Sequence, residues 1–177
     1  MEVIPRSSEK RDKVAITAIV IDDDVDTAYV LSELLQIKGI TVIGRGYDGI
    51  EAIKMYKKLL PDVVFLDVLM ENHDGFYTLE KIREIQSDAI VILITADLTE
   101  ETRKRLLQLD ASAIIYKPYD INEVISETNK LVLRLKQELI KEIEVKKALL
   151  QDLNSILENR LTRTKINELR NKYFKER

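Results

Sequence analysis

The sequence of 177 residues contains no cysteine and a single histidine, His73. Without cysteine the chain forms neither a disulfide framework nor a thiolate zinc site. One histidine also excludes a metal site with several imidazole ligands. No apolar run approaches the roughly 18 residues of a membrane-spanning helix, and residues 1–13 are polar and charged, unlike a signal peptide. These absences predict a cytoplasmic protein without a membrane span, with a flexible leader over residues 1–13.

Glycine and proline are scarce, with five and three copies, and neither occurs between Asp120 and Arg177. Because both residues interrupt helices, we expect this C-terminal part to be helical. Apolar residues recur there every three or four positions, with a slip around Lys146, which is typical of an imperfect coiled coil. We expect a helical extension over residues 134–177, with an interruption in residues 159–164. Thr162 or Thr164 would then cap a short last helix.

Neither sign of charge is in large excess: the net charge is -3, although charged residues make up 33% of the chain. This balance does not predict nucleic-acid binding for the whole molecule. Locally, residues 161–177 hold six lysine and arginine residues against two glutamates. That segment has two interpretations, a solvated amphipathic end or a contact with nucleic acid or an anionic surface.

Four apolar runs end in polar residues with chemical potential. Unbroken runs of this kind are typical of strands buried on both faces of a parallel sheet. The runs and the residues that follow them are 18–21 before Asp22, Asp23 and Asp24; 63–66 before Asp67; 90–94 before Thr95; and 113–116 before Lys117.

Helical patterns separate these runs, so strands and helices alternate through residues 14–133. Such alternation predicts an α/β domain with right-handed crossovers. Five strands suit the flavodoxin-like (βα)5 fold, a doubly wound parallel sheet of order 2-1-3-4-5. In that order Asp22, Asp23 and Asp67 would be neighbours. We expect strands at 15–21, 40–43, 63–67, 89–95 and 113–116, and helices at 24–38, 50–60, 76–85, 100–109 and from 120 or 122.

The side chains gathered at this sheet edge suit phosphoryl chemistry. Clustered carboxylates are ligands for Mg²⁺, and an aspartate in such a site can act as a nucleophile that forms an aspartyl phosphate. Asp67 would be that nucleophile, Lys117 would counter the phosphate charge, and Thr95 would donate a hydrogen bond. Two plainer interpretations stay open at this point. The acidic run 22–24 could simply cap a helix, and Thr95 could be an ordinary residue at a strand end.

The motifs together resemble the receiver domain of two-component response regulators over about residues 15–133. The matching segments are Ile-Asp-Asp-Asp at 21–24, Phe-Leu-Asp-Val-Leu-Met at 65–70, Asp-Gly at 74–75, Ile-Thr-Ala at 94–96 and Lys-Pro at 117–118. The resemblance implies that Asp67 accepts a phosphoryl group from a sensor histidine kinase or a phosphotransfer protein. It further implies that Mg²⁺ is held by Asp22, Asp23, Asp67 and the backbone carbonyl of Leu69, that Thr95 is the switch hydroxyl, and that the Lys117–Pro118 bond is cis.

Three positions depart from the family's pattern. Ile114 occupies the place of the aromatic residue that swings inward on activation, and Tyr116 is not an obvious substitute. Glu71 stands where proline is usual, and Asp110 where glycine usually ends the fourth helix. These departures put the conventional coupling to the output face in doubt and favour another readout.

The sequence therefore predicts a regulator that switches an interaction or a dimerisation through residues 134–177. The apolar stripe of that segment could fold back on the domain, pair with a second copy or bind a helical partner. The alternative function is a phosphorylation-controlled DNA- or RNA-binding regulator that uses the basic C-terminal helix. A phosphatase of the haloacid-dehalogenase type would need an aspartate where Leu69 stands. We therefore expect no conventional enzyme, only the chain's own phosphoryl transfer and slow autodephosphorylation.

Overall fold

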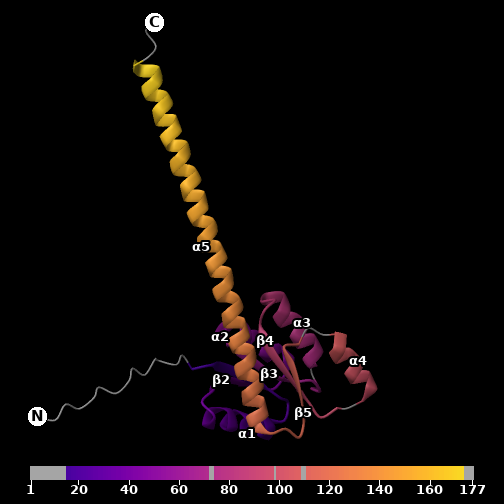
Figure 1. Cartoon of the computed structure of the whole chain (residues 1–177). Coiled ribbons are helices and arrows are strands. Elements are labelled where there is room, and N and C mark those ends of the chain that lie inside the picture. Colours follow the sequence, from indigo (N-terminus) through magenta and orange to yellow (C-terminus); the bar gives the residue numbers. More distant parts are fainter. Residues whose placement is uncertain (1–14, 72–73, 98, 109–110, 174–177) are drawn as a thin grey trace, which may run out of the picture. The chain divides into compact units, whose positions relative to one another are not determined.

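The computed structural model describes residues 15–71, 74–97, 99–108 and 111–173 (Figure 1). The leader expected over residues 1–13 lies outside these residues, as do His73 and Asp110. The chain divides into two compact units, residues 1–132 and residues 133–177. In the part of the chain that is described, no helix is both long and apolar enough to cross a lipid bilayer.

Five parallel strands form one sheet in the order β2-β1-β3-β4-β5, which confirms the predicted topology. The register pairs Ile21 of β1 with Leu66 of β3, and Asp67 of β3 with Ile94 of β4. Because the strands are parallel and in register, their carboxyl ends share one edge of the sheet. The strands are β1 (Thr17–Ile21), β2 (Thr41–Gly46), β3 (Val63–Asp67), β4 (Ile90–Thr95) and β5 (Ala113–Tyr116).

Alternate residues of each strand enter two apolar layers, as the pleat requires. Ile19, Val64 and Leu66 belong to one buried cluster together with Tyr56 and Leu79 of the helices. The intervening strand residues face the other layer. On that side of the sheet, Lys38 Nζ at the end of the first helix donates a 2.8 Å hydrogen bond to Asn122 Oδ1 at the start of the last helix. The helices are α1 (Val25–Ile37), α2 (Gly49–Leu59), α3 (Gly75–Ile85), α4 (Glu100–Gln108) and α5 (Ile121–Tyr173).

An aspartate begins each of the first three helices. Asp24, Asp48 and Asp74 are the N-caps of α1, α2 and α3, and each side chain accepts a hydrogen bond from the backbone N–H three residues on, at 2.7–2.9 Å. These bonds satisfy donors that a helix leaves unpaired at its start. The acidic run at 22–24 therefore does cap a helix, but only through its last member.

Two expectations about boundaries were wrong. β2 continues to Gly46, although a loop was expected from Gly44. α5 runs from Ile121 to Tyr173 without the break expected in residues 159–164. The hydroxyls of Thr162 and Thr164 donate to the carbonyls four residues earlier, at 2.8 and 2.9 Å. Threonines bonded in this way lie inside a helix rather than cap a new one.

Candidate functional site

Lys117 joins two buried aspartates at the carboxyl edge of the sheet. Its Nζ lies 2.8 Å from Oδ2 of Asp22 and 2.8 Å from Oδ1 of Asp67. The two carboxylate side chains are only 8% and 7% exposed, and the lysine side chain is 25% exposed. β1, β3 and β5 end at this point, so the fold brings together residues that are 50 and 95 positions apart in the chain. The sequence-predicted trio of Asp22, Asp67 and Lys117 is thus in direct contact.

The outer oxygens of both aspartates accept backbone hydrogen bonds. Asp67 Oδ2 accepts from the N–H of Leu69 at 2.8 Å, and Asp22 Oδ1 accepts from the N–H of Asp24 at 3.0 Å. Backbone donors and the ammonium therefore fix the orientation of each carboxylate. A carboxylate held in this way needs little reorganisation before it reacts. The Lys117–Pro118 bond is cis, as expected.

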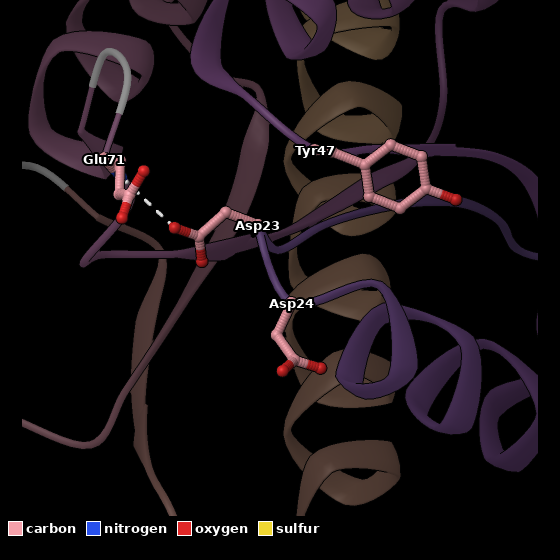
Figure 2. A pocket seen from close by; sticks show the side chains of 4 residues that line it. All are labelled: Asp23, Asp24, Tyr47 and Glu71. Atoms are coloured by element: carbon pink, nitrogen blue, oxygen red, sulfur yellow. Dashed lines mark hydrogen bonds between the residues drawn. The ribbon is translucent and has the colours of Figure 1, made fainter.

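Asp23 lies beside this trio, in a hollow of about 500 Å³ lined by Asp23, Asp24, Tyr47 and Glu71. Figure 2 shows Asp23 and Glu71 facing each other, with the ring of Tyr47 on the other side of Asp23. Asp23 Oδ2 accepts a hydrogen bond from the backbone N–H of Glu71 at 3.2 Å. The loop after β3 is thus tied to the loop after β1. Sequence reasoning gave Glu71 only as a departure from a pattern and missed this contact.

Gly75 holds the start of α3 against the end of β3. Its N–H donates to the carbonyl of Val68 at 3.0 Å. A Cβ at this position would overlap the carbonyl oxygen of Asp67 and lie 2.8 Å from Cα of Val68. The absence of a side chain therefore allows the two backbones to meet directly behind the central aspartate.

Thr95 is fully buried at the end of β4, and its hydroxyl accepts the N–H of Asp97 at 3.0 Å. The carboxylate of Asp97 then accepts from the Thr102 hydroxyl at 2.6 Å and from the N–H of Thr99 at 2.8 Å. Thr99 caps α4 through a 3.3 Å bond from the N–H of Thr102 to its hydroxyl oxygen. Thr95 is therefore linked through Asp97 to the first turn of α4. The cluster of hydroxyls around an aspartate at a helix start was the signal for this network, which sequence reasoning missed.

A family model described as the response regulator receiver domain matches residues 18–129. The chain belongs to the response regulator receiver family. Membership implies phosphorylation-based signalling in a two-component system, with a histidine kinase or phosphotransfer protein as partner.

Among proteins similar to this receiver is the chemotaxis protein CheY of Treponema pallidum. It is 31% identical over 121 residues, which cover 67% of this chain and 84% of the relative. A chain in the crystal structure of the CheX–CheY–BeF3–Mg²⁺ complex from Borrelia burgdorferi is 31% identical, with a TM-score of 0.61, and the match covers 66% of this chain and 88% of that one.

The probable C4-dicarboxylate response regulator DctR of Priestia megaterium is 34% identical over 108 residues. The match covers 60% of the present chain but only 47% of DctR. The receiver thus spans about half the length of that regulator.

Burial and charge act in opposite directions on the central residues of the receiver. Burial raises the pKa of Asp67 above its ordinary value of 3.8, and the hydrogen bond and charge of Lys117 offset only part of that rise. Burial alone would lower the pKa of Lys117, but its bonds to Asp22 and Asp67 outweigh burial and raise that pKa above 10.5. At neutral pH the ammonium is therefore charged and in contact with Asp67.

Replacing Lys117 by methionine is expected to raise the pKa of Asp67 further, because the hydrogen bond and positive charge that lower it are removed. Carbon-13 NMR titration of the aspartate carboxyl groups would measure the shift. Lys81→Met is the matched control, since Lys81 is bonded to Glu84 on α3. An unchanged Asp67 titration in Lys117→Met would contradict the electrostatic coupling described above.

The side chains of this site are of the type that binds Mg²⁺, but they are not arranged as a formed metal site. The three carboxylates of Asp22, Asp23 and Asp67 are the oxygen ligands that this ion prefers. Within the described residues, no three acidic or histidine side chains are grouped so that they could hold a metal. One oxygen of Asp22 and one of Asp67 are instead bonded to Lys117. In charge and ligand type the residues fit a divalent cation.

An aliphatic residue stands at position 114, where the expected pattern has an aromatic one. Ile114 of β5 is partly buried and packs against the core cluster. Tyr116, two residues on, is 41% exposed. Because position 114 holds isoleucine, β5 has no aromatic side chain there that could rotate inward.

Proposed function

We propose that this receiver accepts a phosphoryl group on Asp67 and passes the resulting change to the helical extension, residues 134–177. The observation that carries the proposal is the contact of Lys117 with Asp22 and Asp67 in a buried site. That arrangement supplies a nucleophile, a fixed cation and acidic ligands at one sheet edge. It supports phosphoryl acceptance better than a purely structural role, because a buried ion pair is weak evidence for stability.

The proposed donor is a phosphohistidine on a sensor kinase or a phosphotransfer protein. A carboxylate oxygen of Asp67 would form a bond to phosphorus while the P–N bond of the donor breaks. The imidazole leaves with the electrons of that bond and takes up a proton. Slow autodephosphorylation, in which water attacks the acyl phosphate, would return Asp67 to its carboxylate. Because the donor is made at the expense of ATP inside the cell, we propose a cytoplasmic location.

We assign Mg²⁺ to Asp22, Asp23, Asp67 and the carbonyl of Leu69. When bound, the ion would offset the charge of the phosphoryl oxygens. Lys117 would keep its ammonium beside Asp67 and neutralise further negative charge. Asp22 and Asp23 would orient the oxygen ligands from the loop after β1.

The test of this function is labelling by a small phosphodonor in the presence of Mg²⁺. The full chain should gain the mass of one phosphoryl group, and reduction by borohydride followed by peptide mapping should place it on Asp67. The label should be lost slowly in buffer, as an acyl phosphate is hydrolysed. A label on any other residue, or no label under these conditions, would overturn the assignment.

The switch proposed for this chain uses Thr95 and α4. If the Thr95 hydroxyl turns to donate to a phosphoryl oxygen, its bond from the Asp97 N–H changes, and Asp97 is bonded to Thr99 and Thr102. This link offers a readout that does not need an aromatic residue at Ile114. The phosphoryl group would thereby shift an equilibrium between two existing conformations of the receiver rather than create a new conformation.

Truncation after Leu133 is expected to leave a folded domain that still accepts phosphate. The sheet, the core cluster and the site all lie within residues 15–132. Circular dichroism and labelling by the small phosphodonor would measure both properties. A truncated chain that fails to fold would mean that the extension is part of the core.

A further inference from the structure

Six apolar residues form one stripe along the extension. Placed on a helix of 3.6 residues per turn, they fall within an arc of about 80°. Their exposed fractions are between 44% and 63%. This leucine stripe comprises Leu139, Ile143, Leu150, Leu153, Leu157 and Leu161.

The leucine stripe needs a covering surface. Every described residue from 136 to 172 is exposed. Most helices in proteins gain their stability from packing of an apolar face, and a contiguous apolar surface of this kind marks an interaction site. The question is which surface covers it.

Lys146 decides how two such stripes can meet. It lies within the stripe, between Ile143 and Leu150, and its Nζ donates to Glu142 Oε1 at 2.7 Å. In a parallel, in-register pair, Lys146 would face its own copy across the seam, and opposed like charges are unfavourable. In an antiparallel pair with Leu150 beside Leu153 of the second copy, Lys146 faces Leu157 instead.

The same antiparallel register also places compatible side chains opposite each other at other positions of the two helices. Arg160 then faces Ile143 of the second copy rather than another arginine. On the flank, Glu142 approaches Arg163 of the second copy, and the two-fold axis repeats this attractive pair. The stripe runs from 139 to 161, so its midpoint is at about Leu150. This midpoint lies close to the two-fold axis about which the antiparallel register is symmetric.

We propose that the leucine stripe pairs with the leucine stripe of a second copy in antiparallel orientation. This inference rests on the proposed function in one respect, since it names the partner of the extension that the receiver would control. The partner is an identical chain because the charges along the stripe complement the same stripe when it is reversed. A helix of another protein becomes an outcome of the test.

The absence of cysteine from the chain makes disulfide trapping specific. Ile143→Cys and Arg160→Cys would each be made in the full chain, with one of them carrying a mass tag, then mixed, allowed to exchange and oxidised. Antiparallel pairing puts Ile143 opposite Arg160, so the mixture should form a cross-linked heterodimer. Ile143→Cys alone should not cross-link, because two copies of this position would lie about 25 Å apart at 1.5 Å per residue, beyond the reach of a disulfide.

Ala148→Cys is the matched control, since it lies on the opposite side of the helix from the stripe and should not cross-link in any mixture. Efficient self-linking of Ile143→Cys would establish a parallel pair and overturn the proposal. A monomeric mass by light scattering, with no cross-link in the mixture, would also overturn it and point to another protein as partner.

Labelling of Asp67 by a small phosphodonor is measured on the same variants. A chain that labels normally but does not pair would refute only the antiparallel dimer. A chain that pairs but does not label would refute only the phosphoacceptor role.

Discussion

Asp67→Asn is expected to abolish labelling by a small phosphodonor in Mg²⁺. An asparagine has no carboxylate to attack phosphorus, and Asp67 is the residue to which we assign the nucleophile, held by Lys117 on one oxygen and by the N–H of Leu69 on the other. The loss should exceed about 1,000-fold, the scale on which removal of a nucleophile acts. Mass spectrometry of the intact chain would measure it. Persistent labelling at the original rate would move the site to another residue.

The variant should remain folded. The asparagine oxygen can still accept from Lys117, although its amide nitrogen cannot accept from the N–H of Leu69, a loss of about 1 kcal/mol. The carboxyl pKa of Asp67 is raised in the folded state, so ionisation of Asp67 lowers stability as pH rises from 3.8 through the folded-state pKa. Removing that charge offsets the lost bond at neutral pH. Asp88→Asn, an exposed change at the opposite end of β4, is the control and should label normally.

Gly75→Ala is expected to destabilise the receiver by about 1–3 kcal/mol, as overpacking usually does. The new Cβ would overlap the carbonyl oxygen of Asp67, and a backbone atom cannot move away by rotating a side chain. The end of β3 must therefore shift, and Asp67 shifts with it. Because small displacements of reacting groups are costly, labelling should slow by up to about 100-fold. Urea unfolding and labelling rates would measure the two effects.

Gly44→Ala provides the comparison for this prediction. Its added Cβ would lie 3.0 Å from Sδ of Met55, the flexible end of a side chain that can move aside. The stability loss should be smaller and the labelling rate nearly unchanged. Equal effects of the two substitutions would show that Gly75 has no special relation to Asp67.

Patterns that depend on neighbouring residues were readable from the sequence. Buried strands appeared as apolar runs, and their order along the chain fixed the sheet topology. The contact of Asp22, Asp67 and Lys117 followed from that topology, because parallel strands end at one edge. The acidic run 22–24 was readable as a possible helix cap because its position before a helical pattern is local information, and Asp24 is that cap.

Features that depend on distant packing were not readable. Gly44 and Gly46 indicated a loop, yet they belong to β2, because Met55 of α2 packs where side chains would stand. Thr162 and Thr164 indicated a helix start, yet both hydroxyls bond within α5. In each case the residue type permits two structures, and the surroundings select one.

The separation of the site residues along the chain has a consequence for biosynthesis. Lys117 leaves the ribosome 50 residues after Asp67 and 95 residues after Asp22. A nascent chain that ends before β5 therefore carries both acids without their resident cation, and its sheet lacks an edge strand. On the proposed function, the complete site would form only when the last strand docks, and we expect a chain that ends before β5 to accept phosphate poorly.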